Sequence, residues 1–200
     1  MESRLSPLQR RVVGVLAGLG WTLTGGGALV GYHLGHRVTR DLDLFFKGAT
    51  ELAHLPLEVE GRLRRAGLAV ERIQTAEMFC RLRVSDGVEA FPVDLVAEPT
   101  PGIEAPIEVS PGVLVDTPHE ILVNKLTALF SRWAHRDLVD VRELLANGGD
   151  LERALRDAPR KDAGFSPESL AWVLDTLPTG SLPADLMPFR DALVRRLLAP

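Results

Sequence analysis

The sequence WTLTGGGALVGYHLGHRVTRDLDLFF (residues 21–46) contains the strongest indications of how this chain folds. Residues 21–24 predict a short strand that runs into the triplet Gly25-Gly26-Gly27, and residues 28 to about 35 predict a helical turn or two. Residues 41–46 (Asp-Leu-Asp-Leu-Phe-Phe) begin by alternating acidic and apolar residues, which is the pattern of a strand with one buried face. A strand, a glycine turn, a short helix and a second strand therefore follow one another.

Two carboxylates lie on the predicted strand over residues 41–46. Asp41 and Asp43 are two positions apart and point to the same face, whereas Leu42 and Leu44 point to the other. Neighbouring carboxylates repel each other unless a cation lies between them, and magnesium prefers such oxygen ligands. The alternative is the polar, solvent-facing side of an edge strand, and manganese-dependent glycosyltransferases use a similar Asp-x-Asp motif. The pair therefore predicts a metal site without identifying the reaction.

The glycine triplet precedes these carboxylates. Backbone amides of Gly25, Gly26 and Gly27 can approach a phosphate because no Cβ atom is in the way. The triplet does not match the dinucleotide-binding pattern GxGxxG, since Val30 occupies the place of the last glycine, and no GxxxxGK[ST] loop is present. A glycine run alone is more often a tight turn. A glycine turn, a short helix and then Asp-x-Asp is a rarer combination that favours phosphate and metal binding together.

A third acid lies in a predicted hairpin. The Asp86-Gly87 turn separates strands expected at about 78–85 and 88–97. Asp94 is embedded in the apolar part of the second strand, where an unpaired carboxylate would be costly. It therefore requires a partner, either a metal ion or a basic residue. Carboxylates from two adjacent strands are what two-metal phosphoryl chemistry requires.

The rest of the chain changes from mixed to helical character. Ser6-Pro7 predicts the start of a helix that closes at Gly20. Residues 99–111 form a proline-rich segment that predicts a loop. Further predicted elements are a helix ending at Gly67, a short strand at 113–115, helices at 118 to about 133 and at about 136–146, and short amphipathic helices from 150 to 200. This order predicts the α+β class.

Charged residues interrupt the packing faces of the two central helices. Lys125 lies inside an apolar arc, between Ile121 and Leu129, where it either extends past its neighbours to water or reaches a negative group. Asp137 lies on the packing face of the next helix. As a first-turn acid it can complement the helix dipole, or it can pair with Lys125 or Arg132, or contact a nucleotide directly.

Composition excludes several classes of protein. The net charge of −4 argues against broad coating of nucleic acid. A single cysteine, Cys80, rules out an internal disulfide framework and a CxxC metal site, and we expect it to be a small hydrophobic residue in a strand. No apolar stretch is long enough for a membrane span, and the N-terminus does not resemble a signal peptide. We therefore expect a cytoplasmic protein with no membrane partner.

Taken together, these motifs resemble the AbiEii/AbiGii nucleotidyltransferase toxin family, within the DNA polymerase β-type nucleotidyltransferase superfamily. The resemblance spans roughly residues 20 to 146. The matching motifs are, in order, Gly25-Gly26-Gly27-Ala28-Leu29, Arg37-Val38-Thr39-Arg40-Asp41-Leu42-Asp43, Val93-Asp94, Asn124-Lys125-Leu126 and Arg136-Asp137-Leu138-Val139-Asp140. Gly27 departs from the pattern, because a hydroxyl residue often follows the glycine pair.

The resemblance implies a polymerase β-type core, a mixed sheet with flanking helices over residues 1–115, and a helical subdomain over 116–200 that completes the active site. It also implies a magnesium-dependent enzyme (manganese being the other candidate ion) that transfers a nucleotide from a nucleoside triphosphate to an acceptor. The expected acceptor is the 3′ end of tRNA, which would make the protein a tRNA-modifying toxin restrained by a cognate antitoxin.

The same resemblance assigns roles to individual residues. Asp41 and Asp43, with Asp94, would bind the metal, Lys125 would bind phosphate, and Asp137 would be an essential acid. The nucleotide-binding residues would be Gly25, Gly26, Gly27, Arg37, Thr39, Lys125 and Arg132.

Two other functions are compatible with the same sequence. The nucleotide could be transferred to a small molecule such as an aminoglycoside, or to a protein. The chain could also be a catalytically silent nucleotide-binding module. Following a labelled nucleotide to its acceptor distinguishes these possibilities.

Overall fold

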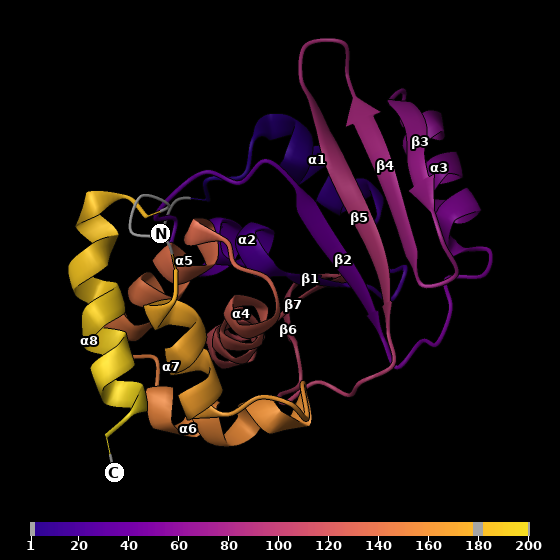
Figure 1. The fold of residues 1–200 in the computed structure, drawn as a ribbon. Helices are drawn as coiled ribbons and strands as arrows, with labels where there is room; N and C mark the ends of the chain where they lie inside the picture. The colour runs from indigo at the N-terminus through magenta and orange to yellow at the C-terminus, as the bar shows by residue number, and fades with distance from the viewer. Residues whose placement is uncertain (1–2, 178–181, 200) are drawn as a thin grey trace. The chain divides into compact units, whose positions relative to one another are not determined.

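The computed structural model describes residues 3–177 and 182–199 and divides the chain into two compact units (Figure 1). The first unit is Met1–Thr117 and contains all the strands described; the second is Pro118–Pro200 and is helical. Each unit is considered by itself below.

A seven-stranded mixed sheet organises the first unit, in the order β3-β4-β5-β2-β1-β7-β6. The β2–β5 and β1–β7 pairs are parallel and the other neighbours are antiparallel. The strands are β1 (Thr22–Thr24), β2 (Leu42–Lys47), β3 (Ala69–Thr75), β4 (Phe79–Ser85), β5 (Ala90–Glu98), β6 (Ile107–Ser110) and β7 (Val113–Val115). The predicted hairpin around Asp86-Gly87 is confirmed as β4–β5.

The two faces of the sheet differ in polarity. Along β2, Leu42, Leu44 and Phe46 are buried, and the residues between them are half-buried. The apolar face continues across the neighbouring strands, because Leu44 of β2 lies opposite Leu95 of β5 and Leu95 lies opposite Cys80 of β4. Cys80 is buried in β4, which confirms its predicted role as a small hydrophobic residue.

Helices α1 (Pro7–Val15) and α3 (Leu55–Arg65) complete the first unit's apolar core, and Figure 1 shows α3 beside β3. Ser6 and Gln9 form a capping box at the start of α1, as the Ser6-Pro7 pair predicted. The helix ends at Val15 and not at Gly20, because the chain turns at Gly18, whose N–H donates to the carbonyl of Gly112 at 2.8 Å.

The glycine triplet is helical, which differs from the predicted turn. Helix α2 (Gly25–Ala28) includes all three glycines and continues into a π-helical turn, η1 (Leu29–His33). An ideal Cβ on Gly27 would lie 3.1 Å from Leu23 and from Leu42, so this turn packs tightly against the apolar face of β1 and β2. Close packing against the sheet explains how so flexible a sequence is held in a helix.

Three strand assignments differ from the sequence prediction. Strands β3 and β6 were not predicted, and both lie at the edges of the sheet with largely exposed side chains. An edge strand that buries neither face lacks the alternation on which prediction depends. Strand β2 begins at Leu42, so Asp41 precedes the strand.

The described part of the second unit consists of helices, as predicted, and residues 178–181 and 200 of the predicted helical stretch lie outside the described residues. They are α4 (Pro118–Ser131), α5 (His135–Ala146), α6 (Leu151–Asp157), η2 (Ala158–Arg160), α7 (Pro167–Asp175), η4 (Ala184–Leu186) and α8 (Met187–Leu197). None of the helices in the described part of the chain has both the length and the apolar composition needed to cross a membrane. The mixed sheet and these helices confirm the predicted α+β class.

The two-faced sheet predicts a large difference between two identical substitutions. Leu44→Ala removes a side chain that is 0% exposed and should lower the free energy of unfolding by about 2–5 kcal/mol. Leu57→Ala removes one that is 67% exposed, on α3, and should change it by less than about 0.5 kcal/mol. Urea denaturation measures both, and equal effects would contradict the assignment of the buried face.

Candidate active site

Four polar side chains form a row across the centre of the sheet. Thr24 lies opposite Asp43, Asp43 lies beside Asp94, and Asp94 lies opposite Arg81. Residues directly opposite each other on paired strands project to the same face. The row therefore lies on the face opposite Leu42 and Leu44, and it unites two of the predicted metal ligands.

Asp94 has a basic partner in the structure. Both of its carboxylate oxygens accept hydrogen bonds from Arg81, at 2.7 Å from Nε and 2.6 Å from Nη2. The Asp94 side chain is 9% exposed and that of Arg81 is 44% exposed. This fork is the basic-residue alternative that the sequence left open. The role of Asp94 as a metal ligand stays a prediction.

The pKa of Arg81 reflects the acidic residues near it. The hydrogen bond to Asp94 raises the pKa of the Arg81 guanidinium above its ordinary value, and partial burial opposes that shift. The negative charges of Asp94, Asp41 and Asp43 raise the same pKa further. Arg81 therefore lies within the electrostatic field of all three acids.

Helix α2, whose three glycines form a single helical turn called the glycine turn below, lies close to this row. Gly25 has a φ of +58°, and a Cβ atom added there would lie 3.0 Å from Asp43 Oδ2. A Cβ atom on Gly26 would lie 2.9 Å from Arg37 Nη2 and 2.9 Å from Thr39 Oγ1. Only glycine allows the backbone to come so near these polar groups. Within the first unit, the structure thus brings Asp43, Arg37 and Thr39 against the glycine turn.

Hydrogen bonds fix the segment that carries Asp41. Thr39 Oγ1 donates to Asp41 Oδ1 at 2.9 Å, and Gln9 Nε2 donates to the Thr39 carbonyl at 3.2 Å. Gln9 is also the capping-box residue of α1, so one buried side chain connects the first helix to the site. The sequence analysis missed this role of Gln9, because the capping pattern indicates only a local function.

Asp41 and Asp43 are the residues of this site that could hold a magnesium ion, and their role as ligands stays a prediction. Within residues 3–177 and 182–199, no three His, Cys, Asp or Glu side chains stand together as a ready-made metal site. Magnesium does not require one, because it commonly takes one or two carboxylates and completes its shell with water and substrate phosphates. The first unit therefore places carboxylates that could bind a metal ion beside backbone amides that could bind phosphate.

The second unit contains a buried charge cluster. Lys125 Nζ lies 2.6 Å from Asp137 Oδ1 and 2.8 Å from Asp140 Oδ2, and all three residues are buried. The structure thus shows the Lys125–Asp137 pairing that was one of the sequence alternatives, and it adds Asp140, which lies one helical turn further along α5. Arg132 is exposed, just beyond the end of α4. Phosphate binding by Lys125 and Arg132 stays a prediction.

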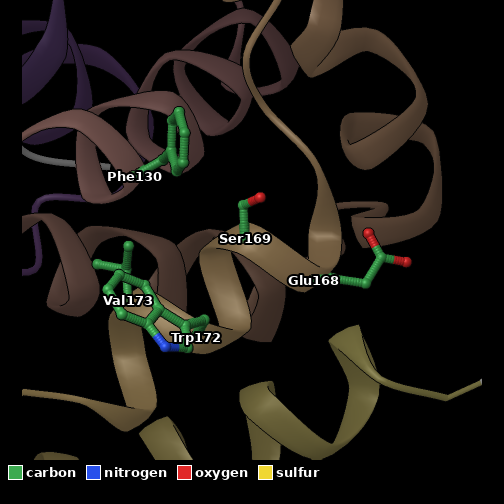
Figure 2. Close-up of a pocket in the computed structure, with 5 residues that line it drawn as sticks. All are labelled: Phe130, Glu168, Ser169, Trp172 and Val173. Carbon is green, nitrogen blue, oxygen red and sulfur yellow. The ribbon is translucent and has the colours of Figure 1, made fainter.

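A separate apolar hollow also lies in the second unit. It has a volume of about 410 Å³ and is lined by Phe130, Glu168, Ser169, Trp172 and Val173 (Figure 2). Trp172 is 68% exposed at its edge. None of the residues that line this hollow belongs to the site predicted from the sequence.

Comparison with known proteins gives one family match. The family model described as the nucleotidyl transferase AbiEii toxin, type IV toxin–antitoxin system, matches residues 8–198. The match extends well beyond residues 20–146, the span of the motifs recognised in the sequence. Among curated protein sequences, none matches this chain.

Solved structures share the fold. JHP933 from Helicobacter pylori is 24% identical, with a TM-score of 0.56 over 95% of this chain and 90% of its own. A putative nucleotidyltransferase from H. pylori is 23% identical, with a TM-score of 0.56 over 96% of this chain and 97% of its own. An antigenic nucleotidyltransferase-like protein from Paracoccidioides brasiliensis is 13% identical, with a TM-score of 0.51 over 93% of each chain.

The buried charge cluster predicts that Lys125 is needed for stability. Lys125→Ala would leave two carboxylates buried without their cation and should lower the free energy of unfolding by about 3–5 kcal/mol. The matched control Arg132→Ala removes an exposed cation and should change it by less than about 0.5 kcal/mol. Chemical denaturation of both variants is the measurement. A Lys125→Ala variant as stable as the control would mean that the cluster contributes nothing to folding.

Proposed function

This chain belongs to the AbiEii family of nucleotidyltransferase toxins, and from that membership we propose that it transfers a nucleotide from a nucleoside triphosphate to the 3′ end of tRNA, with magnesium or manganese as the required ion. One observation carries the proposal within the first unit. The glycine turn lies so close to Asp43 that a Cβ atom on Gly25 would be 3.0 Å from the carboxylate. Amides suited to phosphate and carboxylates suited to a metal ion therefore adjoin each other.

The bond changes of the reaction are simple. The acceptor hydroxyl oxygen forms a bond to the α-phosphorus of the triphosphate, and the bond from that phosphorus to the bridging oxygen of pyrophosphate breaks. Divalent ions, when bound, supply charge neutralisation at the attacking and leaving oxygens and lower the pKa of the hydroxyl. The protein's task is to position the triphosphate and to hold the carboxylates in the orientation that the ion requires.

Residues of the first unit divide this task. Asp41 and Asp43 hold the ion, and the hydroxyl of Thr39 orients Asp41 by donating to its Oδ1. The backbone amides of the glycine turn bind phosphate oxygens. Arg37, whose guanidinium lies against Gly26, offers a planar pair of donors to the same phosphates.

Charged residues of the second unit are proposed to contribute to phosphate binding and to the active site. Lys125 binds phosphate and Asp137 is an active-site acid, as the family resemblance implies, and Arg132 adds an exposed cation. The ion pairs to Asp137 and Asp140 keep the Lys125 ammonium in place. Asp137 Oδ2 is buried and, within the described residues, accepts no hydrogen bond, which leaves it available to a donor or a cation.

Label transfer tests the function directly. The full chain is incubated with each α-labelled nucleoside triphosphate in turn, with magnesium and total tRNA, and the products are separated on a denaturing gel. We expect label on intact tRNA with one or more of the triphosphates, and loss of that label when the 3′ end has been oxidised beforehand. Label on protein or on a small molecule would replace tRNA as the acceptor, and no label in any fraction would contradict the proposal. Co-expression with a gene that relieves its toxicity would identify the proposed antitoxin.

The metal assignment predicts the behaviour of Asp41→Ala and Asp43→Ala. Each substitution removes a proposed ligand and should reduce label transfer by more than about a hundredfold. Thermal unfolding without metal should be unchanged or shift slightly upward, because one of two repelling charges is gone. Asp175→Ala, which removes an exposed acid at the end of α7, serves as the control and should keep full activity. Near-normal turnover in either site variant would refute the assignment.

The glycine turn predicts a difference between Gly25→Ala and Gly48→Ala. Both glycines have positive φ, +58° and +80°, so each alanine should cost about 1–2 kcal/mol of stability. Only the Cβ on Gly25 would press on Asp43, whereas a Cβ on Gly48 would meet nothing within 4 Å. Label transfer should therefore fall at least about tenfold in Gly25→Ala alone, although the melting temperatures of the two variants fall alike. Equal activities would show that the close approach at Gly25 is not needed.

A further inference from the structure

Arg81 was not among the residues assigned to the site from the sequence, yet it belongs to the central row of polar side chains. The β4–β5 register places it directly opposite Asp94, and the parallel β2–β5 register places Asp94 beside Asp43. Its guanidinium donates to both Asp94 oxygens, at 2.7 and 2.6 Å. Arg81 therefore lies on the strand next to Asp94, and Asp94 lies on the strand next to Asp43.

The fork has a consequence for metal binding. A carboxylate that accepts two hydrogen bonds from one guanidinium directs one lone pair of each oxygen at that guanidinium. While the fork is intact, the Asp94 lone pairs that face Arg81 cannot coordinate a divalent ion. Coordination through those lone pairs, and chelation by both oxygens in particular, thus requires Arg81 to leave.

The position of Arg81 at the protein surface lowers the free-energy cost of its leaving Asp94. Its side chain is 44% exposed, so the released guanidinium can be hydrated. Its central carbon lies 5.6 Å from the centre of the Phe79 ring, the next side chain on the same face of β4, so an aromatic surface can hold the cation nearby. Asp94 is by contrast 9% exposed and needs a positive partner at all times.

We propose that Arg81 is a positioning residue of the nucleotidyl-transfer site, which occupies Asp94 as a resident cation and is displaced from it when a divalent ion binds. Before the ion arrives, Arg81 neutralises Asp94 and keeps its carboxylate on the site face. Asp94 then exchanges Arg81 for the ion, so this carboxylate has a positive partner throughout. This inference rests on the proposed function only in taking the ligand of the acids to be a divalent metal ion.

Manganese binding without nucleotide or acceptor tests the exchange. The free Mn²⁺ concentration is followed by electron paramagnetic resonance during titration of the full chain, its Arg81→Ala and Arg81→Lys variants, and the control Arg83→Ala. Arg83 is an exposed arginine on the same face of β4 and lies opposite Pro92 instead of an acid. Arg81→Ala should bind Mn²⁺ about tenfold more tightly than the parent, whereas Arg83→Ala should bind within about twofold of it. Arg81→Lys keeps the charge but cannot form the fork, and it should fall between the parent and Arg81→Ala.

Thermal unfolding gives a second readout. Without metal, Arg81→Ala should melt at a lower temperature than the parent, and saturating Mn²⁺ should restore most of the difference. Unchanged or weaker Mn²⁺ binding in Arg81→Ala would overturn the inference, as would equal gains in Arg81→Ala and Arg83→Ala, which would indicate general electrostatics. Absence of Mn²⁺ binding in both the parent and Arg81→Ala would overturn it too. A failure of label transfer with this binding pattern intact would instead contradict the proposed function alone.

Discussion

The parallel pairing of β2 with β5 is the constraint on which the candidate site depends. It sets Asp43 beside Asp94 on strands that lie about 4.8 Å apart, in the middle of a seven-stranded sheet. The opposite face of the same strands is fully apolar, so neither strand can slip by one residue without burying acids in the core. Hydrophobic burial of one face therefore holds two mutually repelling carboxylates together on the other, and the free energy for this comes from residues such as Leu44 and Leu95.

The surroundings of this pair neutralise Asp94 and enclose Asp43. Arg81 holds Asp94 from the hairpin side, and the glycine turn borders Asp43 from the β1 side. The segment that carries Asp41 is tied by Thr39 and, through Gln9, to the first helix. Each tie comes from a different part of the first 117 residues, so the arrangement is preorganised before any ligand binds. Preorganisation of this kind is what phosphoryl transfer demands, since the protein contributes mainly position and charge.

The second unit holds charge in a different way. Lys125 is buried between two acids of the following helix, so the cluster is compensated internally and has a structural role whatever else it does. In the first unit, by contrast, the arginine that compensates Asp94 is nearly half exposed. A buried ion pair resists exchange because both partners have lost their hydration, whereas a partly exposed one can exchange partners. This difference is why activity and stability are expected to separate for the first unit's acids and to be linked for Lys125.

Much of this protein could be predicted from local sequence. The alternation around Asp43, the Ser6-Pro7 helix start and the Asp86-Gly87 turn each depend on neighbouring residues, and the α+β class and the family motifs followed from their order. Prediction was weaker where packing prevailed over local preference. The glycine triplet became helical because it packs against Leu23 and Leu42.

Register was determined only by the tertiary structure. A two-residue turn at Asp86-Gly87 would pair Ser85 with Val88 and set Arg81 opposite Pro92, but the connection in the structure spans residues 86–89 and sets Arg81 opposite Asp94. The sequence by itself determined which residues carry charge and which face of each strand they occupy, because alternation along a strand is a local property. Only the tertiary structure decided which charge lies beside which, because register depends on turn geometry and on packing between segments far apart in the chain.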